Sequence, residues 1–421
     1  MPNLASSAGL MPRFSSPPRS GSEVPEEITE EAGVTGPEGP ALRIVPLVEE
    51  GAVVAQGAPL AHLRDQEGLC LVAPMAGRVA RLRLLPGRRL SEIVLFREPG
   101  GDRHRHEAKG AEADPRGLMQ HAGLWPLLRR RPFGGMPPPG ERPAAIVVMA
   151  ADSRPLAPDP RSALEGREEA FGRGLAALAG LTDGPVHVVA GAGPALLEPG
   201  LAGGRVQAAR CGTRHPQGLA GWQVHGLAPA RIEAPVWDIH AEDVATLGAL
   251  LETGLVPETR LVHVAGPELR ESRLLYTQPG ADLRGLTHRI ALPGGHALLS
   301  GSPLCGRPAH WLGARDRQVS VMPREAGPAP VHWLRAALTR SATPPPVIPT
   351  AALDQAFAGA LPAAALIRAL TAGDEDTAIG LGLLSLLEED LALADYILGG
   401  TARLRALLRA MLDRIETERA A

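Results

Sequence analysis

Residues 42–97 alternate short apolar runs with glycine-containing turns. The apolar runs are 42–45, 52–54, 69–72 and 93–96, and the turns contain Gly51, Gly57 and Gly87. Short strands separated by such turns are typical of a small, closed β structure. We therefore expect residues 41–100 to fold as a separate β domain.

Between residues 120 and 258, continuous apolar runs alternate with segments of helical period. The apolar runs are 144–150 and 185–190, and the helical segments are 162–181, with Ser162 as N-cap, and 243–254. Apolar runs without polar alternation are typical of strands covered on both faces of a sheet. Their alternation with helices predicts an open α/β domain over 120–258.

The pattern changes after residue 258. Residues 259–322 hold short strands, a short helical segment at 280–290 and turns rich in glycine and proline, which favour a β-grasp-like module. Residues 323–349 form a proline-rich linker, and residues 350–421 have helical composition and period. An apolar stripe along the last helix predicts a docking face, either for its own bundle or for a partner.

The N-terminal residues lack the basic start and apolar run of a secretory signal, and they are rich in serine and proline. We expect residues 1–40 to be a disordered tail. The longest apolar run, 378–387, is shorter than the roughly 20 residues that cross a bilayer. We therefore expect no transmembrane segment.

Charge and cysteine usage narrow the chemistry further. The formal net charge of −3 gives no basic surplus for binding nucleic acid. Cys70, Cys211 and Cys305 are isolated, which argues against a disulfide framework and fits a reducing cytoplasm. Since an iron–sulfur cluster needs about four thiolates, we do not expect this chain alone to hold one.

The segments EEGAVVAQGAPLAHL and VAPMAGRVARLRLLPGRRL, in that order, resemble the barrel-sandwich fold of biotinyl and lipoyl carrier domains. Such a carrier needs a lysine at a hairpin tip, where its cofactor is attached through an amide bond. That place falls near Gln66, and the sole lysine, Lys109, lies outside the unit. Because a carboxamide cannot be acylated in this way, we predict the carrier fold without a covalently bound cofactor.

Several segments together resemble one known family, the A subunit of the sodium-translocating NADH:quinone oxidoreductase (Na+-NQR). They are GLWPLLRRRPF (123–133), HPQGLAG (215–221), VAGPELRESRLL (264–275), LLSGSPLCG (298–306), WLGARDRQVSV (311–321) and LLEEDLALADYI (386–397). They follow one another in the family's order. The family is related to the peripheral C subunit of Rnf complexes.

This resemblance implies a multi-domain α+β architecture. It consists of a barrel-sandwich domain (41–100), a Rossmann-like α/β domain (120–258), a soluble-ligand-binding β-grasp (SLBB-like) domain (259–322) and a C-terminal helical domain (350–421). The sequence departs from the family in residues 1–40, in a shorter linker after Val321, and at 394–400. Many members have cysteines in that last segment, and this chain has none there.

The resemblance also implies a function. The chain would be a peripheral subunit on the cytoplasmic face of the bacterial inner membrane, helping to bind or position quinone, with ubiquinone as the candidate substrate. NADH oxidation, the flavins, the iron–sulfur centre and sodium transport would belong to other subunits, so the chain would not be catalytic alone. Two alternatives are a non-catalytic scaffold paralogue and an electron-transfer subunit like the C subunit of Rnf complexes.

The segment 123–133 is the first candidate site. It offers Trp125, Leu128, Arg129, Arg130, Arg131 and Phe133. A quinone head group needs an apolar or aromatic face and donors for its carbonyl oxygens, and arginine can both donate and stack. Quinone contact, an interface with a partner and an internal anchor between domains all remain open for this segment.

The segment 215–221 is the second candidate. His215 could donate to a quinone oxygen or transfer a proton near neutral pH, and Gly218 could let a ligand approach the backbone. The alternative is a loop whose φ angles demand glycine. By contrast, 191–193 lacks the third glycine of a dinucleotide fingerprint and is followed by Pro194, so we do not expect NAD there.

Overall fold

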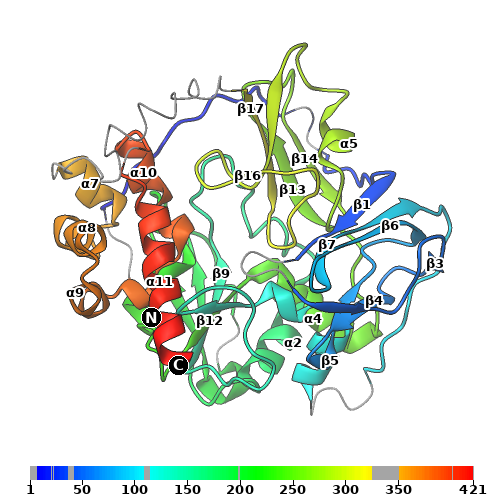
Figure 1. Cartoon of the computed structure of the whole chain (residues 1–421), viewed down its shortest axis with the longest axis horizontal. Coiled ribbons are helices and arrows are strands. Elements are labelled where there is room, and N and C mark those ends of the chain that lie inside the picture. The colour runs from blue at the N-terminus through cyan, green and yellow to red at the C-terminus, as the bar shows by residue number, and fades with distance from the viewer. Residues whose placement is uncertain are drawn as a thin grey trace.

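The structure is a computed structural model. It describes residues 7–19, 21, 23–36, 42–108, 114–197, 200–324, 350–400 and 402–420. They form a mixed α/β structure with several sheets, and a helical region at the carboxyl-terminal end of the chain (Figure 1). Lys109 and residues 325–349, which make up nearly all of the predicted linker, lie outside the described residues.

The first β region contains two antiparallel sheets, in the orders β1-β7-β6-β3 and β2-β4-β5. The strands are β1 (Glu31–Val34), β2 (Ile44–Pro46), β3 (Val53–Val54), β4 (Pro59–Leu63), β5 (Gln66–Val72), β6 (Gly77–Leu85) and β7 (Arg89–Arg97). Leu60, Leu69 and Ile93 are fully buried or nearly so between them. Gln66 is exposed and opens β5 directly after the β4–β5 turn, which is the hairpin position predicted for it from the sequence.

The second region is a five-stranded sheet in the order β11-β10-β9-β12-β8. Its strands are β8 (Arg129–Arg131), β9 (Ala145–Ala150), β10 (Val186–Ala190), β11 (Val206–Arg210) and β12 (Val236–His240). β9 to β12 are parallel, whereas β8 joins β12 antiparallel at one edge. Every residue of β9 is buried, as expected of a strand covered on both faces.

Helices cover both faces of this sheet. α2 (Glu168–Ala179) and α4 (Ala241–Thr253) share a core with Ile146 and Val148, whereas α3 (Ala220–Leu227) shares one with the intervening residues of β9. α2 and α4 pack so closely that a Cβ on Gly248 would collide with the carbonyl of Ala170. The helix predicted to start at Ser162 begins six residues later, after a series of turns that ends with Gly166 at φ +72°.

The third sheet has the order β14-β13-β17-β15-β16. Its elements are β13 (Arg260–Ala265), β14 (Arg273–Thr277), α5 (Leu283–Thr287), β15 (His296–Ser300), β16 (Arg307–Pro308) and β17 (Gln318–Pro323). β13 pairs antiparallel with β14 and parallel with β17. The short helix predicted at 280–290 is α5, which Asp282 caps by accepting hydrogen bonds from two backbone N–H groups.

The helical region contains α7 (Ala351–Ala356), α8 (Ala363–Ala372), α9 (Glu375–Gly380), α10 (Ala392–Ile397) and α11 (Leu404–Ala420), with 3-10 turns η3 (Leu383–Ser385) and η4 (Glu388–Leu391). The long helix predicted at 376–387 ends early, because Gly382 takes φ +95°. The apolar stripe of α11 is buried at Leu408, Met411 and Ile415 in a core formed mainly by this region, so it docks on its own bundle.

The described part of residues 1–40 is not the disordered tail that its composition suggested. The backbone N–H of Leu10 donates to the His215 carbonyl at 2.7 Å, and β1 completes a sheet beside β7. Figure 1 shows this segment (blue) running from the helical region past the third sheet to the first β region. Composition missed it because backbone hydrogen bonds hold the segment without many apolar side chains.

Candidate functional site

A cavity of about 830 Å³ lies where the parallel sheet, the third sheet and the helical region meet. Residues just after β9 and at the end of β12 form part of its wall, including Asp152, Arg154 and His240. The wall also includes Cys305, from the loop after β15, and Glu389, from η4. Gly36 and Leu42 of the first β region line it too, so the cavity is built from regions that are far apart in the sequence.

The strand order explains why a cavity forms at this place. β9 lies between β10 and β12, and because the three strands run parallel, the chain leaves all of them at the same edge of the sheet. In open parallel sheets, ligands bind in the crevice outside the carboxyl ends of the strands. The cavity occupies this position, because residues 151, 152 and 240 line it.

One wall of the cavity carries apolar and aromatic groups. Leu128 and Phe133 line it, and the Arg130 guanidinium lies 5.4 Å from the centre of the Phe133 ring. Arg130 also donates to Glu141 Oε2 at 2.7 Å. Phe133 has φ +79°, a conformation that is uncommon for aromatic residues and often found at functional sites. A planar ligand could contact the ring here.

A second wall contains a charged cluster centred on Asp238. Its carboxylate accepts hydrogen bonds from Arg129 at 3.3 Å, Arg131 at 3.0 Å and Arg315 at 2.7 Å. Burial acts to raise the pKa of Asp238, but the three guanidinium groups outweigh it and lower this pKa. Asp238 is therefore a permanent anion that fixes three cations, of which Arg129 and Arg315 line the cavity.

Glu389 extends this cluster into the helical region. Arg129 forms a hydrogen bond with its carboxylate, and Arg131 lies 3.7 Å away. Burial acts to raise the pKa of Glu389, but Arg129, Arg154 and Arg131 hold it well below its usual range. Since Arg131 also donates to Asp390 Oδ2 and the Ser385 carbonyl, both at 2.8 Å, strand β8 anchors the helical region to the sheet.

The structure divides the predicted site residues into two groups. Leu128, Arg129, Arg130, Phe133 and Gly218 line the cavity, and quinone contact stays a prediction for them. The others, Trp125, Arg131 and His215, are almost fully buried and do not belong to its lining.

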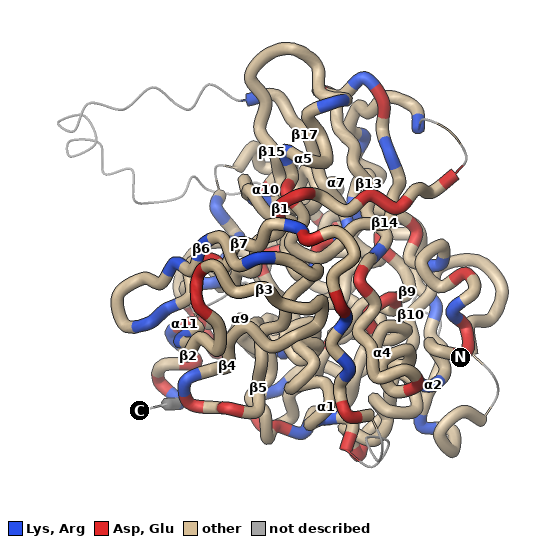
Figure 2. Tube along the Cα trace, turned by 90° about the vertical axis from the view of Figure 1, so that its right-hand side faces the viewer, with Lys and Arg blue, Asp and Glu red and all other residues tan. Residues whose placement is uncertain are grey.

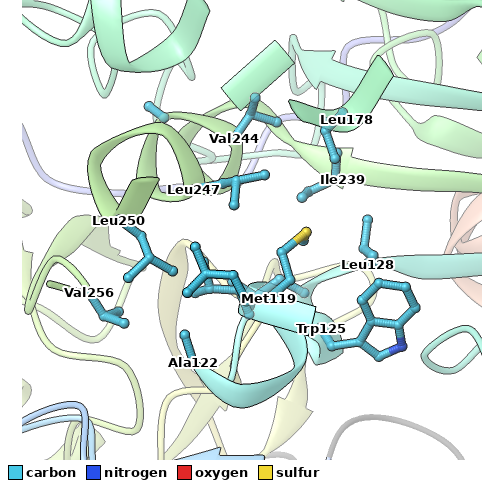
Figure 3. Packing of buried hydrophobic residues seen from close by; sticks show 14 of the residues in the cluster. Met119, Ala122, Trp125, Leu128, Leu178, Ile239, Val244, Leu247, Leu250 and Val256 are labelled. Carbon is cyan, nitrogen blue, oxygen red and sulfur yellow. The ribbon is translucent and has the colours of Figure 1, made fainter. Parts of the chain in front are cut away.

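Trp125 and Arg131 act as internal anchors. The Trp125 indole packs edge-on against Trp237 at 5.3 Å and donates from Nε1 to the Pro137 carbonyl at 2.8 Å. Figure 3 shows Trp125 and Leu128 beside Met119 and Ile239 in the core between this segment and α4. One segment therefore supplies both cavity wall and internal anchor, and quinone contact and a partner interface stay predictions for it.

His215 and Gly218 meet the loop that follows β9. Ser153 Oγ lies 3.2 Å from His215 Nδ1 and accepts a hydrogen bond from the Gly218 N–H at 2.8 Å. Gly218 does not have a positive φ; it is required because a Cβ would collide with the Ser153 backbone nitrogen. Burial lowers the pKa of His215 to about 4, so the imidazole is neutral at pH 7.

Several cavity residues were not predicted as site residues from the sequence. Asp152, Arg154, Asp238 and Glu389 are among them, and each makes an ion pair. Asp152 directly follows an apolar strand, a position that could have identified it, whereas Asp238 is the middle residue of β12. Arg315 and Cys305 come from loops and gave no comparable signal.

The described residues contain neither a metal-binding cluster nor a membrane-spanning helix. No group of three or more histidine, cysteine or acidic side chains among them could hold a metal ion. Within the same part of the chain, no helix has the length and apolar character needed to cross a membrane. In Figure 2, acidic and basic residues are scattered among the other residues of the chain.

A model of a protein family, described as "NqrA second alpha/beta domain", matches residues 112–256. The five-stranded sheet and its helices therefore belong to an NqrA-type α/β domain. Over 407 residues the chain is 34% identical to the A subunit of the Na(+)-translocating NADH-quinone reductase of Serratia proteamaculans (strain 568), covering 88% of this chain and 90% of the relative. The corresponding protein of Alcanivorax borkumensis is 31% identical over 406 residues, with the same coverage.

The chain therefore belongs to the family formed by the A subunit of the Na(+)-translocating NADH-quinone reductase, an oxidoreductase complex, and the resemblance found in the sequence is confirmed. Among solved structures, a chain of the NAD+-reducing [NiFe]-hydrogenase in the H2-reduced state matches with a TM-score of 0.40 and 15% identity. This match covers 72% of this chain and 64% of the other, and it is too weak to define the fold.

Proposed function

We propose that the central cavity binds the head group of a quinone, with ubiquinone as the candidate. The cavity at the carboxyl ends of β9 and β12 is the observation that carries this proposal. It offers an aromatic face at Phe133 and an apolar one at Leu128, with the Arg130 guanidinium beside them as a donor for a carbonyl oxygen. The names of the relatives, which belong to a quinone reductase, support the same ligand.

We further propose the finer domain assignments. The two sheets of the first β region would be a barrel-sandwich domain, the parallel sheet a Rossmann-like domain, and the third sheet an SLBB-like β-grasp domain. The arrangement of β13, β14 and β17 around α5 supports the last assignment. The domain limits predicted from the sequence stay predictions.

In this proposal the chain is a peripheral subunit on the cytoplasmic face of the bacterial inner membrane. NADH oxidation, the flavins, the iron–sulfur centre and sodium transport would belong to partner subunits. The chain would position quinone for electron transfer from them. Because the cavity is mixed in character, with fixed charges opposite an apolar wall, it suits a planar ligand that carries polar oxygens.

Titration of the purified chain with ubiquinone-1, followed by isothermal calorimetry, tests the proposal. We expect saturable binding that weakens about tenfold in Phe133→Leu and in Arg130→Gln, through loss of the ring face and of a donor. Phe96→Leu is the matched control, because Phe96 is exposed on the first β region and does not line the cavity.

Two outcomes would favour the alternatives. Absence of saturable binding, with the variants folded, would favour the scaffold paralogue. A purified chain that carries flavin and absorbs visible light would favour an electron-transfer role like that of the C subunit of Rnf complexes.

A further inference from the structure

A second, smaller pocket lies beside the central cavity, with a volume of about 120 Å³. Its wall combines apolar residues from several regions of the chain, including Leu71, Leu127, Val256, Pro257 and Leu312. Pro126, Asp243 and Ala314 border both cavities. The pocket is therefore a separate space at the junction of the first β region, α4 and the third sheet.

One cation, Arg260 at the start of β13, lines this pocket. The residue is only 8% exposed. Within the described part of the chain its guanidinium donates one hydrogen bond, to the Ala314 carbonyl, and forms no ion pair. Burial, followed by the nearby Arg317, lowers the pKa of Arg260 to about 10, so it remains charged at pH 7.

The neighbouring carboxylates are already occupied. Arg317 donates to Glu242 Oε2 at 2.6 Å and to Asp243 Oδ1 at 2.5 Å. Glu242 also lies 3.9 Å from Arg167, and Asp316, the third carboxylate that acts on Arg260, accepts a hydrogen bond from Ser300 Oγ at 2.5 Å. A buried guanidinium whose neighbouring carboxylates pair elsewhere is unfavourable in a mostly apolar pocket unless an anion accompanies it.

We propose that this pocket binds a short-chain monocarboxylate. Its carboxylate would pair with the Arg260 guanidinium, whose planar fork of donors matches two carboxylate oxygens. Its alkyl group would lie against Leu127 and Val256. A cavity of about 150 Å³ can hold benzene, so the smaller volume here suits a chain of a few carbons.

Binding should also strengthen the junction of the three regions. The occupant would touch residues of the first β region, of the η1 turn (Trp125–Leu127) and of the third sheet at once. A ligand that binds only the folded chain raises its melting temperature by mass action. The rise should be specific to carboxylate and absent with chloride.

The test is a titration of the full chain with sodium propionate, against sodium chloride at equal ionic strength, followed by calorimetry and thermal unfolding. We expect saturable heat and a rise in Tm with propionate alone. Arg260→Gln should weaken binding about tenfold or more, because it removes the charged donor. Arg64→Gln, which removes an exposed arginine of the first β region, should change nothing.

Two further measurements keep the proposal falsifiable. Val256→Phe retains Arg260 but fills the pocket, so it should abolish propionate binding even if Arg260→Gln fails to fold. Octanoate should bind about tenfold more weakly than propionate, because its chain exceeds the space. Absence of saturable propionate binding, or equal binding in wild type and in either folded variant, overturns the proposal.

Discussion

The hairpin tip at Gln66 and the cavity wall around Asp238 are opposite kinds of position within one chain. Gln66 is exposed at a turn, where a carrier domain would bear its cofactor. Asp238 is 2% exposed and holds three arginines from separate elements. In the barrel-sandwich fold proposed for the first β region, the residue that would bear a cofactor is changed, so function must be argued from sites and not from the fold.

The strongest test of this contrast is Asp238→Asn. We expect a loss of about 3–5 kcal/mol in the free energy of unfolding, because three guanidinium groups lose their shared anion inside the protein. Urea denaturation monitored by circular dichroism measures it. Asp183→Asn is the control: its side chain is 86% exposed and it pairs with Arg142, so it should cost less than about 1 kcal/mol. Equal losses of stability in the two variants would show that the buried Asp238 contributes no more to stability than an exposed carboxylate.

Gly218→Ala tests how tightly the cavity wall is packed. The added Cβ would collide with the Ser153 backbone, and we expect a cost of about 3 kcal/mol in the same denaturation assay. Gly140→Ala introduces the same methyl group where no atom lies within 4 Å. A Gly218→Ala protein as stable as Gly140→Ala would show that the loop after β9 can move away.

Stability near the cavity should depend on pH through His215. Its pKa is about 4 in the folded chain and about 6.5 when unfolded, so the unfolded chain binds more protons between these values. The contribution is complete above pH 6.5 and declines as the pH falls toward 4. We expect His215 to account for a loss of about 2 kcal/mol between pH 7.5 and pH 5.

His215→Gln should remove that part of the pH dependence, whereas His288→Gln, at an exposed position, should keep it. Urea denaturation at the two pH values measures both. An unchanged slope in His215→Gln would show that the imidazole is not responsible.

Gln66→Lys should have the smallest effect of all. The side chain is exposed, and we expect a change within about 0.5 kcal/mol. A larger change in the urea midpoint would show that the hairpin tip has contacts that its exposure does not reveal.

Much of the fold could be predicted from the sequence, because apolar periodicity is a local signal. The strands at 145–150 and 186–190 appear where their apolar runs lie, and α4 lies within three residues of its predicted limits. Element ends failed where a glycine took a positive φ, as at Gly166 and Gly382. The ordered segment before residue 36 was missed because its partners, such as Ile93, His215 and Tyr276, are not neighbours in the sequence.

The site was harder to predict. Adjacent residues in GLWPLLRRRPF make different contacts, since successive side chains of a strand point to opposite faces of the sheet. Arg130 therefore reaches Glu141 and the Phe133 ring, whereas Arg129 and Arg131 reach Asp238. Their acidic partners come from β12 and η4, more than a hundred residues away, and no local pattern reveals such pairs.

The strand β1 has a practical consequence for handling the protein. It covers the outer edge of β7 over Ile93–Phe96, the part of the first β region with the exposed Phe96. Truncation to residue 42 would leave those backbone donors and acceptors open, a template on which a second molecule could add a strand. Shortened versions should therefore self-associate, and recombinant production is best begun upstream of Glu31.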